Sequence, residues 1–458
     1  MKRFWAGILI LVVVCAAAAG FYAFKPAIDP IEPPKRTAFD QALIEKGAVL
    51  ASVGNCTACH TKPGGKSFAG GLAVPTPFGT LYSTNITPDP ETGIGRWSEA
   101  AFIRAMRDGV DREGSHLYPA FPFDHFTLVS DEDDKALYAY LMTRHAVENQ
   151  PPANRLPFPL TWRPVLAGWK LLFFTSGAYR DDPSQSAEWN RGAYLVEGLG
   201  HCGACHTPRN PLGAENRSAS LSGGDAEGWR AFALDTSSTA PIPWTHDSLF
   251  AYLRQGWHAD HGVANGPMGE VTGNLGRLPD SDIGAMATYL LSRMGEPAAE
   301  RVARGEEVRK QVAAAQGGAP TSASSAPADG PSSRGAVIYQ AACATCHDGS
   351  RPQPFGGIDF HLSSTIAATD PQNAINVVLF GLPAASGRPS AIMPGFAPTL
   401  KDDQVLDLLA YLRQAYAGKP AWADAAAKLA DTRSGKYQVS VRPSDGIERG
   451  PENIGAKD

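Results

Sequence analysis

The distribution of apolar and polar positions separates a short apolar segment at the start of the chain from a longer body. The segment Trp5–Phe24 holds twenty residues without a charge and follows Lys2 and Arg3. Twenty apolar residues are enough to cross a bilayer as a helix. A cleaved signal peptide is the alternative, because residues 16–20 are small enough for a peptidase site. Since the apolar run continues beyond them, we favour a retained anchor, which leaves the basic pair in the cytoplasm and everything after Lys25 outside it.

One pattern of two helices occurs three times in the body. The first helix of each pair contains a basic residue followed by Gly and Ala, at residues 46–48, 191–193 and 334–336. The second helix lies far downstream and contains a Tyr-Leu pair, at 140–141, 289–290 and 411–412. A glycine inside a helix costs stability unless its small size is needed. The repetition therefore predicts a close crossing of the two helices at each glycine, in preference to three unrelated glycines.

Polar residues near the starts of the three second helices are candidate N-caps. They are Ser130, Asp280 and Asp402. A side-chain oxygen at such a position accepts a hydrogen bond from a free backbone N–H of the first helical turn. We therefore expect these residues to set where each second helix begins.

These helices and the stretches between them predict the domain organisation. A signal-anchor and a Pro-rich spacer occupy residues 1–36, and three helical domains follow at 37–150, 189–300 and 334–418. Residues 151–188 are rich in proline and aromatics. They form either an inter-domain strap, which we favour because aromatic side chains are usually buried, or an exposed docking stripe. Residues 301–333 are a flexible linker, and 419–458 is a tail that opens with a short helix.

Length and charge narrow the function classes. The chain has 458 residues, which is enough for about three ordinary domains, and its formal net charge is −5. No long basic run occurs outside the first residues. We therefore expect no nucleic-acid partner.

Six of the seven cysteines lie in three Cys-x-x-Cys-His strings. The strings are Cys56–His60, Cys202–His206 and Cys343–His347, with Cys59, Cys205 and Cys346 as the second cysteines. Such a string attaches c-type haem, because the two thiols bond to the haem vinyl groups and the histidine supplies a nitrogen to the iron. Zinc would need a second ligand pair at finger spacing, and a disulfide framework would not place a histidine after every second cysteine. The strings predict three covalently bound haem c groups with His60, His206 and His347 as axial ligands.

Two methionines are candidates for the opposite axial position. Met268 follows Gly-Pro and Met393 precedes Pro394, at similar distances before the Tyr of the second helix in each domain. A thioether opposite an imidazole raises the haem potential and suits an electron carrier. Packing in the core is the alternative role of each methionine.

The first domain differs, because Phe121 occupies the matching loop position. Phenylalanine cannot bind iron, so Met106, on a helical stretch, is the candidate ligand. His116 and His125 flank the loop and are alternatives, and an iron with an open position is the third possibility.

With these residues in view, residues 1–418 resemble the membrane-anchored triheme cytochrome c subunits of bacterial periplasmic dehydrogenases. The matching segments are Gly54–Cys56, Phe78–Thr80, Ser83–Asp89, His116–Pro119, Gly198–Cys202 and Gly266–Met268. Known relatives serve quinoprotein alcohol dehydrogenases, flavin gluconate or sorbitol dehydrogenases, and molybdenum hydroxylases acting on aldehydes or nicotinate. Phe121, where the alcohol and gluconate branch commonly has methionine, and residues 27–30 are more similar to the molybdenum hydroxylase branch.

The resemblance implies a mostly α fold, with an N-terminal transmembrane helix followed by three class I cytochrome c domains. It also implies an electron-transfer subunit in the bacterial inner membrane, with its haem domains in the periplasm and no substrate chemistry of its own. Electrons would come from a catalytic subunit with a molybdenum, flavin or quinone cofactor and leave to ubiquinone or a terminal oxidase. The alternative is a multihaem redox enzyme, of peroxidase or thiosulfate type, that uses an open iron in the first domain.

Overall fold

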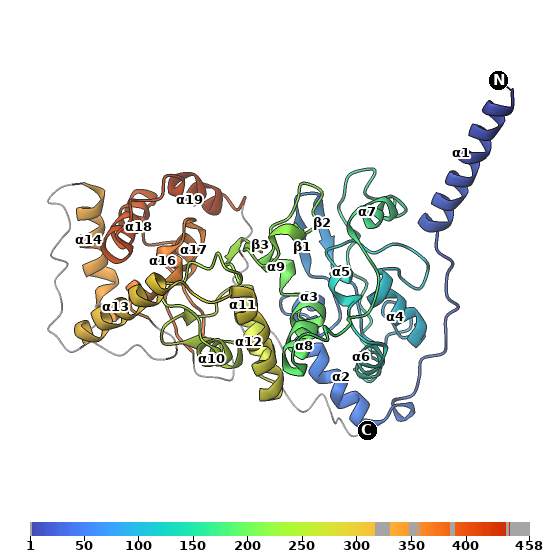
Figure 1. The fold of residues 1–458 in the computed structure, drawn as a ribbon, viewed down its shortest axis with the longest axis horizontal. Coiled ribbons are helices and arrows are strands. Elements are labelled where there is room, and N and C mark those ends of the chain that lie inside the picture. Colours follow the sequence, from blue (N-terminus) through green and yellow to red (C-terminus); the bar gives the residue numbers. More distant parts are fainter. Residues whose placement is uncertain are drawn as a thin grey trace.

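The computed structural model of the chain is mostly helical (Figure 1). It describes residues 2–316, 330–347, 355, 358–384, 390–436 and 439. Residues 317–329 of the predicted flexible linker and the polar end of the tail therefore lie outside the described residues. The first part of that linker was predicted wrongly, because residues 301–316 belong to a helix, α13 (Ala299–Gln316). The regular strands of the described part form three two-stranded antiparallel hairpins. These are β1 (Ala73–Thr76) with β2 (Gly79–Tyr82), β3 (Gly224–Ala226) with β4 (Trp229–Ala231), and β5 (Trp257–His258) with β6 (Gly262–Val263).

The helices follow the three motifs along the chain. The N-terminal helix α1 (Lys2–Ala23) precedes a first group of η1 (Arg36–Ala38), α2 (Gln41–Val53), α3 (Cys56–His60), α4 (Glu99–Asp108), α5 (Phe123–Phe126), α6 (Asp131–Met142) and α7 (Val165–Phe173). The second group is α8 (Ala187–Ala193), the π-helix η2 (Tyr194–Leu199), α9 (Gly203–His206), η3 (Arg217–Ala219), α10 (His246–Gln255), α11 (Pro267–Leu275), α12 (Asp280–Met294) and α13 (Ala299–Gln316). The third is α14 (Pro331–Ala342), α15 (Ala344–His347), η5 (Phe360–Leu362), α16 (Ser364–Ala367), α17 (Gln372–Phe380), α18 (Asp402–Ala417) and α19 (Ala425–Arg433).

Three helix pairs cross where the sequence places the repeated glycines. The pairs are α2 with α6, α8 with α12 and α14 with α18, and the crossing glycines are Gly47, Gly192 and Gly335. A Cβ on these glycines would lie 1.9 to 2.0 Å from a backbone oxygen of the second helix, and 2.7 to 2.8 Å from the Cβ of Tyr140, Tyr289 or Tyr411. Real Cβ atoms do not approach so closely, so any side chain there would force the helices apart. The predicted crossings are confirmed.

The basic residue before each crossing glycine also has a defined role. It forms an ion pair with an aspartate of the second helix: Lys46 with Asp133 at 2.6 Å, Arg191 with Asp282 at 2.8 Å, and Arg334 with Asp407 at 2.5 Å. The basic partners remain half-exposed, so these pairs align the helices rather than add much stability.

Only one of the three predicted N-caps is correct. The Ser130 hydroxyl accepts a hydrogen bond from the backbone N–H of Asp133 at 3.2 Å and caps α6. Asp280 and Asp402 are instead the first residues of α12 and α18, and the cap positions are held by Pro279 and Lys401. An acidic residue in the first turn still interacts favourably with the positive end of the helix dipole.

The hydrophobic interior consists of two main cores rather than three. One continuous core includes Leu50 of α2, Leu137 of α6, Leu195 of η2, Leu275 of α11 and Met286 of α12. A separate core includes Tyr339, Ile375, Leu408, Leu409 and Leu429 from α14, α17, α18 and α19. The first two helix pairs therefore share their interior, whereas the third has its own.

Residues 151–188 combine buried and exposed apolar side chains. In α7, Leu166 and Ala167 are buried, whereas Leu171 and Leu172 point outward with exposed fractions of 73% and 69%. Lys170 is turned inward and its ammonium group donates to the backbone oxygens of Asp108 and Gly109 at 2.5 and 2.7 Å. The segment thus packs against the end of α4 on one side and presents an uncharged apolar face on the other.

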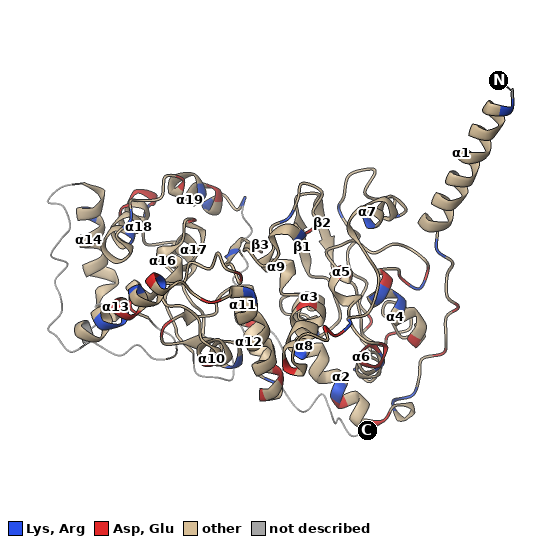
Figure 2. Cartoon of the chain, viewed as in Figure 1, with Lys and Arg blue, Asp and Glu red and all other residues tan. Residues whose placement is uncertain are grey.

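The N-terminal helix extends away from the body (Figure 1). After its first two residues it carries no charge (Figure 2). Among the described residues it is the one helix long and apolar enough, over Arg3–Ala23, to cross a membrane, a test that a signal sequence also passes. Its end lies beside α7, where the rings of Phe24 and Trp162 are 6.5 Å apart.

Candidate haem-binding sites

Each Cys-x-x-Cys-His string lies on or at the start of a short helix that follows the first helix of its pair, with η2 in between in the second group. The three short helices are α3, α9 and α15. Asn55 and His201, the residues before the first cysteine in two strings, have left-handed backbone angles with φ of 49° and 39°. Such angles reverse the chain direction sharply and are tolerated best by Asn, Asp, His and Gly. The turn carries the two cysteines back toward the helix pair.

Two of the three motif histidines are held in the orientation that iron binding needs. Nδ1 of His60 lies 2.7 Å from the backbone oxygen of Thr84, and Nδ1 of His206 lies 2.6 Å from that of Phe232. A carbonyl oxygen can only accept, so Nδ1 carries the proton and Nε2 keeps a free lone pair. Burial lowers the pKa of both imidazoles, which keeps them neutral.

His347 of the third string is held differently. Its ring stacks on Phe360 with centroids 4.4 Å apart and an interplanar angle of 19°. Its Nδ1 is buried and has no hydrogen-bond partner among the residues that the structure describes. Its orientation within the described part therefore depends on ring stacking rather than on a backbone carbonyl.

The second and third sites open into one chamber. A cavity of about 360 Å³ is lined by Cys202, Cys205, His206 and Met268 of the second site and by Cys343, His347 and Met393 of the third. Its other walls include Leu249, Leu253, Val378, Leu408 and Leu412. Apolar walls around a few polar groups are typical of ligand and cofactor pockets. The structure thus brings both predicted methionines to the same cavity as the motif residues, and the donor set of thiol, imidazole and thioether fits a c-type haem.

At the first site, the structure removes one of the candidates that the sequence offered for the second axial ligand. Both ring nitrogens of His125 are engaged: Nδ1 lies 2.6 Å from the backbone oxygen of Glu197 and Nε2 lies 2.8 Å from the Glu215 carboxylate. His125 therefore offers no free nitrogen. Nε2 of His116 lies 3.1 Å from the backbone oxygen of Ala23, but its Nδ1 is buried without a hydrogen-bond partner among the described residues, so His116 stays an alternative ligand.

Met106 and Phe121 remain near the first site. Met106 is buried in α4 within the core that the first two helix pairs share. Phe121 packs on that core and meets the Phe126 ring edge to face at 5.1 Å. A buried thioether is compatible with either packing or ligation, so Met106 stays the candidate that the sequence indicated.

Polar contacts fix the first and second sites to one another. The Tyr194 hydroxyl donates to the Asp133 carboxylate at 2.5 Å, and the Asn274 side chain donates to Asn55, which precedes Cys56. The His125–Glu215 pair adds a buried ion pair across the same boundary. Burial alone would lower the pKa of His125, but Glu215 raises it to about 9, and His125 in turn lowers the pKa of Glu215.

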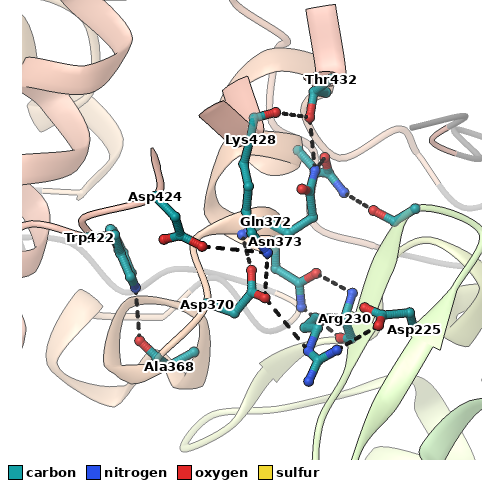
Figure 3. Close-up of polar contacts among 12 residues, drawn as sticks. Asp225, Arg230, Ala368, Asp370, Gln372, Asn373, Trp422, Asp424, Lys428 and Thr432 are labelled. Carbon is teal, nitrogen blue, oxygen red and sulfur yellow. Dashed lines mark hydrogen bonds and ion pairs between the residues drawn. The ribbon is translucent and has the colours of Figure 1, made fainter. Parts of the chain in front are cut away.

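Another set of contacts connects the β3–β4 hairpin to the third helix group (Figure 3). The backbone N–H of Arg230 donates to the Asn373 side chain at 2.8 Å, and that side chain donates back to the Arg230 carbonyl at 2.9 Å. Asn376 donates to the backbone oxygen of Gly228 at 2.8 Å. Asp370 accepts from Lys428 of α19 at 2.6 Å. These bonds hold α17, and with it the third site, against the second.

Sequence reasoning did not identify the carbonyls that orient the histidines. Thr84 lies within the Ser83–Asp89 segment, which the sequence presents only as a family marker, and Phe232 carries no signal at all. A backbone oxygen has no residue identity, so only the fold can reveal it. The cavity also brings in His261 and Asn265, which the sequence did not single out.

Comparison with known proteins shows that the chain is similar to cytochrome c domains and to subunits of bacterial dehydrogenases. The cytochrome c family model matches residues 44–145, and the model of subunit III of cbb3-type cytochrome c oxidase matches 330–412. A nicotinate dehydrogenase subunit of Pseudomonas putida is 46% identical over 94% of this chain, which spans only 36% of that protein. The gluconate 2-dehydrogenase cytochrome c subunit of Pantoea cypripedii is 40% identical, with 89% of this chain and 92% of the relative covered. The fructose dehydrogenase cytochrome subunit of Gluconobacter japonicus is 36% identical, with 90% and 87% covered.

Proposed function

Because the chain belongs to the family of cytochrome c subunits of bacterial dehydrogenases, we propose that it carries electrons on three covalently bound haem c groups. One observation carries this proposal: the same local architecture, a glycine-crossed helix followed by Cys-x-x-Cys-His on a short helix, is present three times. The three helix groups correspond to class I cytochrome c domains at 37–150, 189–300 and 334–418. Residues 1–36 hold the anchor and spacer, and the other segments connect or follow the domains.

The residues of each site have distinct tasks. When bound, the haem supplies an iron that changes between two oxidation states by one electron. The cysteines would fix the group to the chain, and the motif histidine would offer a nitrogen to the iron. Met268 and Met393 would supply thioethers, which favour the reduced state. The apolar walls of the chamber would exclude water from the bound groups.

Electrons enter from a catalytic dehydrogenase subunit and leave to ubiquinone or a terminal oxidase. The names of the relatives support the donor, because each is a subunit of a dehydrogenase. The 46% identity to the nicotinate dehydrogenase subunit, together with Phe121, supports a partner of the molybdenum hydroxylase kind. The relatives favour this electron-transfer role over a multihaem peroxidase or a thiosulfate-type enzyme.

Haem content tests the proposed function directly. In cells competent for c-type maturation, the purified chain should contain three covalent haems per polypeptide, measured by the pyridine haemochrome assay and by intact mass. Replacing Cys202 and Cys205 by alanine should lower the count to two. A wild-type count of two or fewer would contradict the proposal.

Substitutions at the methionines test the second axial ligands. Met268→Ala and Met393→Ala should each lower the potential of one haem or make it high-spin, because a thioether stabilises the reduced iron. Met106→Leu should remove the sulfur-ligated signal of a third haem, whereas His125→Ala should not. Redox titration and low-temperature EPR report both properties. Wild-type spectra in all the methionine variants would show that these side chains only pack.

The anchor has its own test. Because α1 carries no charge after Lys2 and Arg3 and lies outside the body, the protein should stay in membranes after washing with salt, with its N-terminal peptide intact by mass spectrometry. A soluble product that begins near Phe21 would show instead that the segment is a cleaved signal peptide.

A further inference from the structure

Two side chains on the chamber wall, the buried His261 and the partly buried Asn265, present buried polar atoms that have no hydrogen-bond partner among the described residues. His261 is 8% exposed, and both of its ring nitrogens are buried without a hydrogen bond to any described residue. The same holds for Nδ2 of Asn265. A buried polar group without a partner costs about 1–3 kcal/mol and needs an explanation in a stable fold.

Both side chains are held in place by the rest of the fold. The His261 ring stacks on Trp244 with centroids 3.5 Å apart and an angle of 12°, which fixes its plane. Oδ1 of Asn265 accepts from the backbone N–H of Gly266 at 2.8 Å, and its NH₂ group has no partner among the described residues. Gly266 is followed by Pro267 and then Met268. The cavity that His206 lines is also lined by Trp244, His261, Asn265 and Met268.

The chemistry of these atoms selects the kind of ligand. An amide NH₂ is only a donor, and a neutral imidazole has one N–H in either tautomer. A metal cation would need acceptors, but the Asn265 oxygen is already used. Two buried donors on the wall of one cavity match a carboxylate, and charge-assisted hydrogen bonds are about twice as strong as neutral ones.

A c-type haem brings such a carboxylate into the chamber, because each haem has two propionate side chains. We propose that His261 and Asn265 form a binding site for a propionate of the haem on Cys202. The inference rests on the proposed haem at this string. The Cys202 haem is favoured over the Cys343 haem because both donors belong to the loop that leads to Met268. The site stabilises a buried negative charge near the iron without binding the iron itself.

Three variants of the full-length, haem-loaded protein test the site. His261→Phe keeps a ring that can stack on Trp244 but removes the donor. Asn265→Asp keeps an acceptor for the Gly266 N–H and turns the amide donor into a negative charge. Both should shift the oxidised-to-reduced equilibrium of one haem toward the oxidised form, by about three- to tenfold for His261→Phe and by more for Asn265→Asp. His261→Gln should recover much of the wild-type value, because it retains a donor.

His258→Phe is the matched control. The His258 ring packs against His261 with centroids 5.4 Å apart, a contact that phenylalanine can keep. Its Nδ1 accepts from the Asp260 N–H at 3.1 Å, and it does not line the chamber. It should leave every potential unchanged. Redox titration identifies the haem, because the component moved by Met268→Ala should also be the one moved by His261→Phe. Resonance Raman bands of the propionates report the lost hydrogen bond independently of the iron ligands.

Several outcomes would overturn the site. Unchanged potentials and unchanged propionate bands in both His261→Phe and Asn265→Asp would do so. A haem that becomes high-spin in His261→Phe would make the histidine an iron ligand, and a shift of a component other than that of Met268→Ala would place the site on another haem. The haemochrome count separates these results from failure of the proposed function, since the variants should retain three haems.

Discussion

Gly192→Ala should cost about 3 kcal/mol of folding free energy or more, and should reduce haem attachment at Cys202. The added Cβ would lie 2.0 Å from the backbone oxygen of Ala285 and 2.8 Å from the Cβ of Tyr289. Neither is the end of a flexible side chain, so α8 and α12 must separate along their whole contact. Thermal unfolding followed by circular dichroism, together with the haem count, measures both effects.

Gly168→Ala is the matched control. Gly168 also lies inside a helix, α7, but nothing is within 4 Å of the Cβ it would gain. Alanine is a better helix former than glycine, so this variant should be as stable as wild type or more stable by up to about 1 kcal/mol. Equal unfolding temperatures for Gly192→Ala and Gly168→Ala would refute the importance of the crossing.

Glu215→Gln should destabilise the protein by about 3–5 kcal/mol near pH 6, because the buried His125 loses its hydrogen-bonded carboxylate and keeps only the weaker interaction with Asp124. The side chains of His125 and Glu215 are only 8% and 13% exposed, so water cannot compensate for the loss. The same substitution at Glu113, whose pair with Arg112 is at the surface, should change stability by less than about 0.5 kcal/mol. Denaturant unfolding of both variants against wild type gives the comparison.

The difference in unfolding free energy between wild type and Glu215→Gln should depend on pH in a defined direction. The folded pKa of His125 is raised from 6.5 to about 9, so its contribution is fully present below pH 6.5 and is lost as the pH rises through 9. The pKa of Glu215 is lowered from 4.5, so its contribution is present above pH 4.5 and is lost as the pH falls through the lowered value. The stability gap between wild type and Glu215→Gln should therefore be largest between pH 4.5 and 6.5 and should shrink toward pH 9. A gap that grows with pH would contradict the ion pair.

The features that the sequence predicted correctly are those that depend on local spacing. Gly47, Gly192 and Gly335 recur at matched positions before the cysteines, and the requirement for a small residue at a helix crossing then follows from size alone.

Two of the predicted caps were wrong by one residue. The sequence places them too late, at Asp280 and Asp402, because an acidic residue is favourable both at the cap and in the first turn.

Features that depend on distant parts of the chain could not be predicted. His125 and Glu215 are 90 residues apart, and nothing in either segment indicates the other. The cavity that joins the second and third sites depends on the contact of Arg230 with Asn373, which are 143 residues apart. The sequence leaves His125 open as a ligand of the first iron, since a lone histidine does not reveal what its nitrogens bind.

The division of the interior into two cores affects the order in which the protein can mature. Leu137 and Leu195, from the first two helix pairs, belong to one core, whereas Leu408 of the third pair belongs to another. Cooperative units of this kind open and close as wholes. We therefore expect haem attachment at Cys56 and at Cys202 to precede closure of the same core, and attachment at Cys343 to depend on the other. The described residues thus divide three candidate haem sites between two main cores.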